Sequence, residues 1–430
     1  MASINRGPER ITTHEGGTAK RISPERQLER SVMACLLWED SFYESGEDIG
    51  DRIKRLCQEV PQDVVMEMAK KAKWEMGLRH VPLWMAVSAK AFEKDFLKSL
   101  IRRPDDMTEM LSMYWKEGKK PIPKQMKLAF QEKFNEFSVY QLSKYRQLNR
   151  EIKLRDVLKL VHPRPEDIFQ AETFKGLVDG TLSPPNTWET RLMLGEESKK
   201  DVFEDLMRNK SLGALAFLRN LRGMQEAGVD SGLIKSYARD LKADIILPFQ
   251  FIQAAQYAYF LQDELETLML KSLKEFPHLK GTTTLIVDVS GSMNSLINSG
   301  KLQRDKAAQG LAIALREICD DIRIFAFGDT VREVPNRRGF ALGDLLKARG
   351  EGTQLKKSLD YIKRISKTDR YIVITDEQTH DGISQGGPKH YLLNVAAYKN
   401  GVGYYDWIHI DGWSFGVIKY IASLEEGGIE

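Results

Sequence analysis

The sequence predicts two unlike parts, a helical-repeat region (an α-solenoid) followed by an α/β domain. Between residues 23 and 276, apolar side chains recur at three- and four-residue spacing, with breaks at Gly, Pro or charge clusters. This pattern is typical of amphipathic helices. After residue 280, short β-branched apolar runs alternate with amphipathic stretches, as in a parallel sheet covered by helices. The length of 430 residues also exceeds what one hydrophobic core usually serves.

The helical part is predicted from stretches that each have one apolar face to bury. Typical ones span residues 24–38, 64–74 and 211–221. Because short connections join them, we expect helix pairs stacked as in a solenoid, over residues 23–280. Residues 1–22 form a separate N-terminal segment.

The α/β part is predicted over residues 281–430, where apolar runs and amphipathic stretches alternate. Strands are expected at 283–289, 322–327, 371–376, 391–397 and 406–410, and helices at 301–318, 353–366 and 414–421. This order predicts a parallel sheet with helices on its faces.

Composition excludes several classes of protein. The sequence is 42% hydrophobic and 29% charged, and it contains no apolar run of about eighteen residues that could span a bilayer. The N-terminus has no apolar stretch after its basic residues, so we expect no secretory signal and a cytoplasmic protein. Cys35, Cys57 and Cys319 are odd in number and widely spaced, which argues against a disulfide framework or a zinc site and favours buried free thiols. A monomer is the default expectation.

Oxygen ligands gather at the predicted carboxyl ends of the strands. Asp288, Ser290 and Ser292 alternate directly after the first strand, Thr353 lies in a Gly-rich loop, and Asp376 ends another strand. Ligands usually bind at this edge of an open parallel sheet. A Ser- and Gly-rich helix-capping turn is the alternative for the first three residues. The complete set of hard oxygen donors predicts Mg²⁺, or Mn²⁺, as a cofactor.

This arrangement resembles the metal-ion-dependent adhesion site (MIDAS) of von Willebrand factor A-type domains. The resemblance implies that an Asp, Glu or phosphate group of a partner completes the coordination shell. It implies adhesion and not hydrolysis. The sequence offers one metal site and seven scattered histidines, too few groups for a hydrolase, so no enzyme is expected.

Positive charge is concentrated in residues 116–164. This segment holds thirteen Lys and Arg against five Asp and Glu, whereas residues 281–430 hold nineteen of each sign. Its aromatic residues are Phe130, Phe134, Phe137, Tyr140 and Tyr145. Cations neutralise phosphates and aromatic faces stack on bases, so the segment predicts binding of single-stranded RNA. The alternative is a solvated helix face whose aromatic residues belong to the core.

Residues 138–149 and 153–165 resemble the TROVE domain of the Ro 60 kDa autoantigen family, in its bacterial or phage form. Further segments occur in that family's order, at 13–17, 188–192, 215–224, 246–251, 394–398, 401–404 and 407–414. The resemblance therefore extends over nearly the whole chain.

The resemblance implies a ring of HEAT-like helical repeats closed by the A-type domain. Such a protein binds Y-like noncoding RNA on its outer basic surface and misfolded or single-stranded RNA ends in its central hole. It acts in RNA quality control or as a tether for an exoribonuclease. A metal-dependent protein-adhesion scaffold, acting through the A-type domain, is the alternative function.

The family motifs imply RNA contacts at two positions, Lys144 and His162. Charge and position in the basic segment extend the predicted RNA surface to Arg146, Arg150, Lys153, Lys119, Lys120 and Lys124. Leu148 stands where the family can place a further basic residue.

Overall fold

The computed structural model describes residues 11–12, 18–19, 23–33, 46–145, 151–183, 187–242, 246, 248–274, 276–297, 302–350, 352–396, 406–413 and 415–426. By its internal contacts the chain forms two compact units. Gly50–Ser198 is called the helical unit, and Met1–Ile49 together with Lys199–Glu430 is called the mixed unit.

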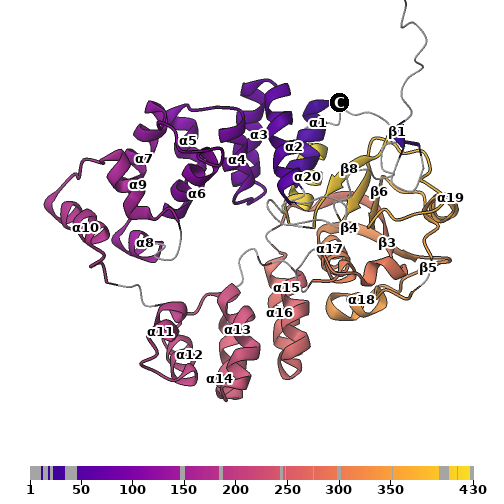
Figure 1. Cartoon of the computed structure of the whole chain (residues 1–430). Helices are drawn as coiled ribbons and strands as arrows, with labels where there is room; N and C mark the ends of the chain where they lie inside the picture. Colours follow the sequence, from indigo (N-terminus) through magenta and orange to yellow (C-terminus); the bar gives the residue numbers. More distant parts are fainter. Residues whose placement is uncertain are drawn as a thin grey trace, which may run out of the picture. The chain divides into compact units, whose positions relative to one another are not determined.

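The described residues of the helical unit form helices and their connections (Figure 1). The helices are α2 (Gly46–Glu59, which begins just before the unit), α3 (Gln62–Trp74), α4 (Val81–Ser88), α5 (Lys94–Leu100), α6 (Pro104–Tyr114), α7 (Lys124–Glu136), α8 (Val139–Lys144), α9 (Leu154–Val161), α10 (Ile168–Asp179) and α11 (Trp188–Leu194). They pack on near neighbours in sequence, such as α3 on α4 and α5 on α7. This local packing is typical of stacked helix pairs.

Helix α9 illustrates why these short segments are helical. Leu154, Val157, Leu158 and Val161 are all buried, and their spacing of three and four residues places them on one face. The helix ends at His162, which adopts a left-handed conformation with φ 55°. Glycine is the usual residue at such a helix end.

The mixed unit contains further helices and a short N-terminal hairpin. Its elements outside the large sheet are β1 (Ile11–Thr12), β2 (Thr18–Ala19), α1 (Pro24–Met33), α12 (Lys199–Arg208), α13 (Ala214–Glu226), α14 (Ser231–Asp240), α15 (Pro248–Tyr257), a short 3₁₀ helix (Tyr259–Leu261) and α16 (Gln262–Ser272). Helix α1 contacts β8, the last strand of the sheet.

The sheet of the mixed unit has six strands in the order β5-β4-β3-β6-β7-β8. The strands are β3 (Leu279–Asp288), β4 (Cys319–Phe327), β5 (Val331–Glu333), β6 (Arg370–Thr375), β7 (His390–Asn394) and β8 (Ile408–Asp411). All neighbours are parallel except β5, which pairs antiparallel with β4. The wholly parallel sheet predicted from sequence is therefore corrected at one edge, because only Gly328 to Thr330 separate β4 from β5 and a parallel pairing needs a longer crossover.

Helices α17 (Arg304–Ile318) and α19 (Leu355–Ile365) pack on the faces of this sheet. Helix α18 (Gly339–Leu345) packs on α17 and α16, and α20 (Phe415–Glu426) is the last helix. Leu355, Leu359 and Ile362 of α19 pack against Ile286 and Val373. Side chains alternate along a strand, so the intervening positions face the opposite side, where α17 contacts β3.

The change from helices to strands falls where β3 begins at Leu279, whereas the two compact units divide after Ile49 and after Ser198. The domain boundary near residue 280 stays a prediction. Helix α15 nevertheless packs directly on α17, and the rings of Phe249 and Trp413 meet edge to face at 4.8 Å. The predicted free thiols are found at Cys57 and Cys319, which are both buried, whereas Cys35 lies outside the described residues. Within those residues, every helix is too short or too polar to cross a membrane.

Candidate functional site

The carboxyl ends of four parallel strands carry one row of polar side chains. Thr375 pairs with Asn394 and Asn394 with Asp411, while Asp288 follows the pair formed by Val287 and Ile374. Asp288, Thr375 and Asn394 are fully buried, and Asp411 is 2% exposed. The strand register therefore brings residues from β3, β6, β7 and β8 to one edge of the sheet.

Asp288, Ser290 and Ser292 lie together at this edge, as the sequence predicted for adjacent strand-end residues. Asp288 Oδ1 accepts the backbone N–H of Ser290 at 2.8 Å. The hydroxyls of Ser290 and Ser292 lie 3.1 Å apart. A 3₁₀ turn, Gly291–Asn294, begins directly after Ser290, so the chain turns tightly enough to aim alternate side chains at one point.

Asp376 follows β6 and is fully buried. Its Oδ2 accepts a hydrogen bond from Arg304 Nη1 at 2.7 Å, and Arg304 Nη1 also donates to the carbonyl of Ser292 at 3.3 Å. Burial raises the pKa of Asp288 to about 7, and the nearby Asp376 carboxylate adds to this rise. Buried carboxylates in this position gain stability from an additional cation.

Thr353 is the fifth predicted ligand and is 4% exposed. Its carbonyl accepts the hydroxyl of Thr379 at 3.4 Å and the backbone N–H of His380 at 3.4 Å. The Thr353 loop therefore packs on the loop that follows Asp376. All five side chains offer hard oxygen donors, which is the donor chemistry that suits a Mg²⁺ ion retaining some of its waters.

Sequence reasoning missed three residues at the same edge, two of them buried and His409 half-buried. Glu377, His409 and Asp411 form a cluster in addition to the predicted ligands. One signal was available: His409 and Asp411 alternate at the end of a predicted strand, so they share one face.

The lysines predicted to bind RNA between α6 and the start of α7 are exposed, and two of them lie next to aromatic rings. Lys119, Lys120 and Lys124 are all exposed. Lys119 Nζ lies 5.9 Å from the centre of the Trp115 ring, and Lys120 Nζ lies 4.4 Å from that of Tyr114. These distances are within the range of cation–π contacts.

The same pairing recurs around α8. Lys144 is exposed, and its Nζ lies 5.8 Å from the ring centres of both Tyr140 and Tyr145. Tyr140 itself is 54% exposed. The predicted contacts Arg146 and Arg150 lie outside the described residues.

Lys153 and His162 bracket helix α9. The backbone N–H of Lys153 donates to Asp156 Oδ2 at 2.9 Å, which starts the helix. His162 is exposed, and Gln131 of α7 donates to the carbonyl of Val161 at 2.5 Å. The structure thus holds the His162 turn against α7 and leaves the side chain accessible.

The aromatic residues of the basic segment fall into two groups. Phe130 and Phe134 are fully buried and Phe137 is 8% exposed, so these three belong to the core. Tyr140 is exposed and Tyr145 half-buried. Of these five residues, the two tyrosines can present a face to a ligand, whereas the phenylalanines pack in the core, as the second alternative holds. RNA binding by the segment stays a prediction.

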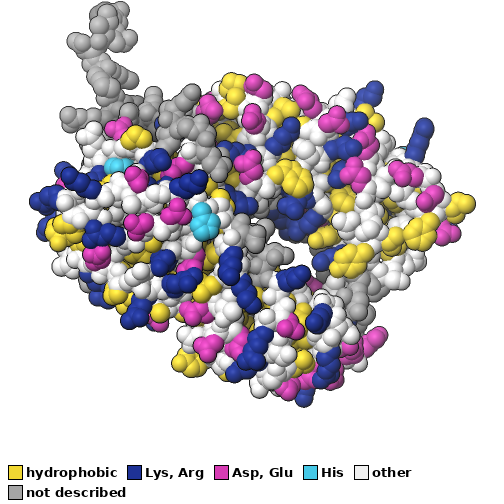
Figure 2. Space-filling model, turned by 180° about the vertical axis from the view of Figure 1, so that it is seen from behind, with side chains coloured by type: hydrophobic (Ala, Val, Ile, Leu, Met, Phe, Trp, Pro, Cys, Tyr) yellow, Lys and Arg dark blue, Asp and Glu magenta, His cyan; other side chains and the backbone are white. Residues whose placement is uncertain are grey.

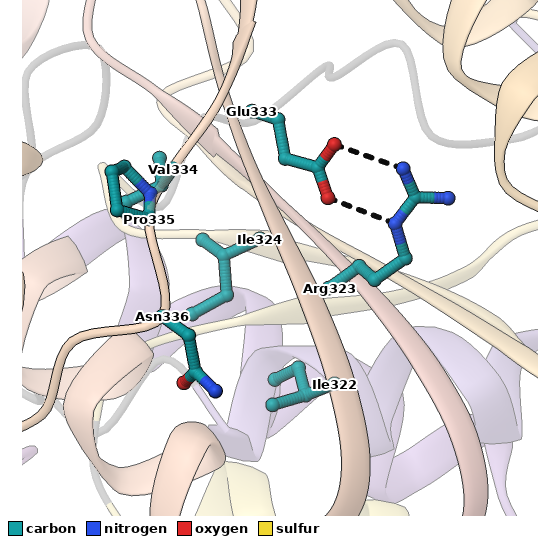
Figure 3. A pocket seen from close by; sticks show the side chains of 7 residues that line it. All are labelled: Ile322, Arg323, Ile324, Glu333, Val334, Pro335 and Asn336. Atoms are coloured by element: carbon teal, nitrogen blue, oxygen red, sulfur yellow. Dashed lines mark hydrogen bonds and ion pairs between the residues drawn. The ribbon is translucent and has the colours of Figure 1, made fainter.

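Figure 2 shows Lys and Arg side chains interspersed with Asp and Glu over the face it presents. A cavity of about 370 Å³ lies along β4 and β5, away from the carboxyl edge of the sheet (Figure 3). There Arg323 and Glu333 point toward one another and form two hydrogen bonds of 2.9 Å. Because its two charged side chains pair with each other, this cavity is a weaker candidate for a ligand site than the carboxyl ends of the strands.

The chain is similar in structure to the crystallographically determined Ro (RSR) protein of Deinococcus radiodurans. The two share 16% sequence identity and superpose with a TM-score of 0.65, over 94% of this chain and 100% of that protein. The predicted fold class, and the resemblance to the Ro family at the level of the fold, are thereby confirmed. No protein-family model matches the chain, and no curated protein matches it.

Proposed function

We propose that the chain is an RNA-binding protein of the Ro type. The observation that carries the proposal is the pairing of exposed lysines with aromatic rings at Lys119, Lys120 and Lys144, in and next to the segment whose motifs resemble the TROVE domain. Lysines neutralise phosphates, and an exposed ring such as that of Tyr140 stacks on an unpaired base. The Ro-like fold supports the same function.

The finer proposal concerns the RNA and its fate. We expect a Y-like noncoding RNA and misfolded or single-stranded RNA ends as ligands. The protein then acts in RNA quality control or as a tether for an exoribonuclease, as a cytoplasmic monomer without its own catalytic activity. The motif resemblance supports this role. Crosslinking in cells, followed by sequencing of the bound RNA, tests which RNA is held.

Salt dependence tests the RNA surface directly. If about six phosphates of a single strand are neutralised, log affinity falls with a slope near −4 against log salt concentration. Replacing Lys119, Lys120 and Lys144 together by Gln should weaken binding and reduce that slope by about 2. Fluorescence anisotropy with a labelled single-stranded RNA measures both quantities.

A matched control uses three exposed lysines of the mixed unit, Lys210, Lys271 and Lys274. Their joint replacement by Gln changes the net charge equally, so it separates a local surface from a general charge effect. Equal losses in both triple variants, or none in the first, would reject the assignment of the RNA surface.

The second part of the proposal is a Mg²⁺ or Mn²⁺ ion held by Asp288, Ser290, Ser292, Thr353 and Asp376. The donor set and the raised pKa of Asp288 support it. A bound ion would offer a coordination position to an acidic group of a partner. Asp288→Ala should abolish Mg²⁺ binding measured by calorimetry and leave single-stranded RNA affinity mostly unchanged, whereas adhesion to a protein through the metal would be lost in EDTA.

A further inference from the structure

Glu377, His409 and Asp411 place three metal-ligating side chains at one point. One ligand atom from each lies within 4.8 Å of the others. His409 Nε2 lies 3.4 Å from Asp411 Oδ1 and in direct contact with Glu377 Oε1. The three side chains are 0%, 4% and 3% exposed in chain order. They converge in the interior and not on a solvated surface.

The backbone positions this cluster from strand β8 and from the loop that follows β6. His409 and Asp411 are alternate residues of β8 and pair with Leu392 and Asn394 of β7. Glu377 directly follows Asp376, in a left-handed conformation with φ 60°. The two ligands on β8 are therefore held more rigidly than ligands on a loop.

A hydrogen bond ties Glu377 to the neighbouring oxygen-rich site. Its backbone N–H donates to the hydroxyl of Thr375 at 3.0 Å, and the same hydroxyl donates to Asp288 at 2.6 Å. The cluster is therefore adjacent to the five predicted ligands and shares none of them.

The arrangement of donors favours a metal ion. Two carboxylates buried side by side repel each other, and their removal from water costs several kcal/mol unless a cation compensates them. The same imidazole nitrogen, Nε2, faces both carboxylates. A protonated Nε2 carries one hydrogen and can donate it to one carboxylate only. A metal ion can bind Nε2 and both carboxylates at once.

We infer that Glu377, His409 and Asp411 form a second divalent-metal site that binds a first-row transition ion, Zn²⁺ or Mn²⁺. An imidazole ligand favours such ions over Mg²⁺, which prefers oxygen donors alone. Three protein ligands leave at least one coordination position open, the pattern of zinc sites that also bind water or an acidic ligand. The site is distinct from the one assigned to Asp288, and it stands whether or not the chain binds RNA.

Metal counting on the full-length chain tests the inference. The protein is stripped with EDTA, dialysed against Mn²⁺ or Zn²⁺ in the presence of excess Mg²⁺, and analysed by mass spectrometry for bound transition metal. Asp288→Ala should retain one tightly bound transition ion per chain. His409→Gln should lose it, with a fall in affinity beyond the 10- to 100-fold typical of outer-shell changes. The exposed His278 serves as the matched control, and His278→Gln should bind as the wild type does.

Spectroscopy keeps the test independent of folding defects in the variants. Mn²⁺ bound to the Asp288→Ala chain should show nitrogen coupling by electron spin-echo spectroscopy, because an imidazole ligates it. Asp411→Asn, which preserves the shape of the side chain, should weaken binding in the same direction. Absence of nitrogen coupling, or undiminished metal in both His409→Gln and Asp411→Asn, would overturn the inference and leave the imidazole hydrogen-bonded to one of the two carboxylates.

Discussion

The hydroxyl of Thr375 donates a hydrogen bond to Oδ2 of Asp288 across 2.6 Å, which joins the ends of β6 and β3 through side chains. The oxygen of Thr375 also accepts the backbone N–H of Glu377 at 3.0 Å. One fully buried hydroxyl thus orients a carboxylate of the predicted Mg²⁺ site and the residue that begins the second cluster.

Thr375→Val should lower the free energy of unfolding by about 1–3 kcal/mol, because it keeps the shape of the side chain and leaves buried polar groups unsatisfied. Urea denaturation of the full chain measures the change. Thr267→Val is the control, since Thr267 is exposed on α16 and donates only to the carbonyl of Asp263; its effect should stay within about 0.5 kcal/mol. Similar losses in the two variants would contradict the role given to Thr375.

Arg370 is fully buried and holds the end of α20 to the sheet. Its Nε donates to Glu425 at 2.6 Å, its Nη1 to Thr283 at 2.8 Å and its Nη2 to the carbonyl of Lys280 at 3.0 Å. Arg370→Met should therefore destabilise the protein by about 3 kcal/mol, the lower end of the range for breaking a buried ion pair, because Glu425 keeps Lys389 as a counter-charge at 3.3 Å. Thermal and urea unfolding measure this loss.

The double variant Arg370→Met with Glu425→Leu separates charge from packing. Removing both partners of a buried ion pair is often nearly neutral, so the double variant should recover most of the stability lost in the single one. A double variant as unstable as Arg370→Met alone would mean that the hydrogen bonds to Thr283 and Lys280, and not the ion pair, dominate.

Much of the fold could be predicted because its elements carry local patterns. The apolar residues of α9, from Leu154 to Val161, have helical spacing, and β3 is marked by a run of β-branched apolar residues. Strand β5, of three residues, was missed because so short a segment has no period to detect. Helix α18 was missed as well.

The candidate ligands could be predicted only where a local signal marks them: adjacency, a strand end or, for Thr353, a Gly-rich loop. Asp288, Ser290 and Ser292 adjoin in sequence, and Asp376 ends an apolar run. His409 lies on β8 and Glu377 follows β6, and these two strands are not neighbours in the sheet. Their contact therefore depends on strand order and register, which the sequence does not state. The burial of Phe134 against the exposure of Tyr140 likewise depends on which helix face is covered.

His390 predicts acid sensitivity of the α/β part. Its ring lies 4.9 Å from that of Tyr371 and 5.0 Å from that of Trp407, and burial, followed by the charge of Lys363, lowers its pKa from 6.5 to about 4. Above pH 6.5 the ring is neutral in both folded and unfolded chains. As pH falls from 6.5 toward 4, the His390 ring is protonated in the unfolded chain but stays neutral in the folded chain. The free energy of unfolding therefore falls over that pH range.

The slope from this group is at most about 1.4 kcal/mol per pH unit, and less to the extent that solvent screens the partly exposed ring. Urea unfolding at pH 7 and pH 5 measures it. His390→Phe keeps an aromatic ring between Tyr371 and Trp407 but cannot titrate, so its stability should fall less between the two pH values. Parallel pH profiles for wild type and variant would contradict the assignment to His390.

Gly310 tests whether α15, which precedes the sheet in sequence, and α17, which packs on the sheet, share a close-packed contact. A methyl group at Gly310 would lie 3.0 Å from the backbone nitrogen of Phe249, and backbone cannot move aside as a flexible side chain can. Gly310→Ala should therefore destabilise by about 1–3 kcal/mol through overpacking, although alanine favours a helix by about 1 kcal/mol over glycine. Gly343 of α18 is the matched control, because the nearest atom to its added methyl group would be Gln309 Oε1 at 3.5 Å, an ordinary contact. In urea unfolding, Gly343→Ala should leave the free energy of unfolding unchanged or raise it. If Gly310→Ala raised it as well, α15 and α17 would not be close-packed at Gly310.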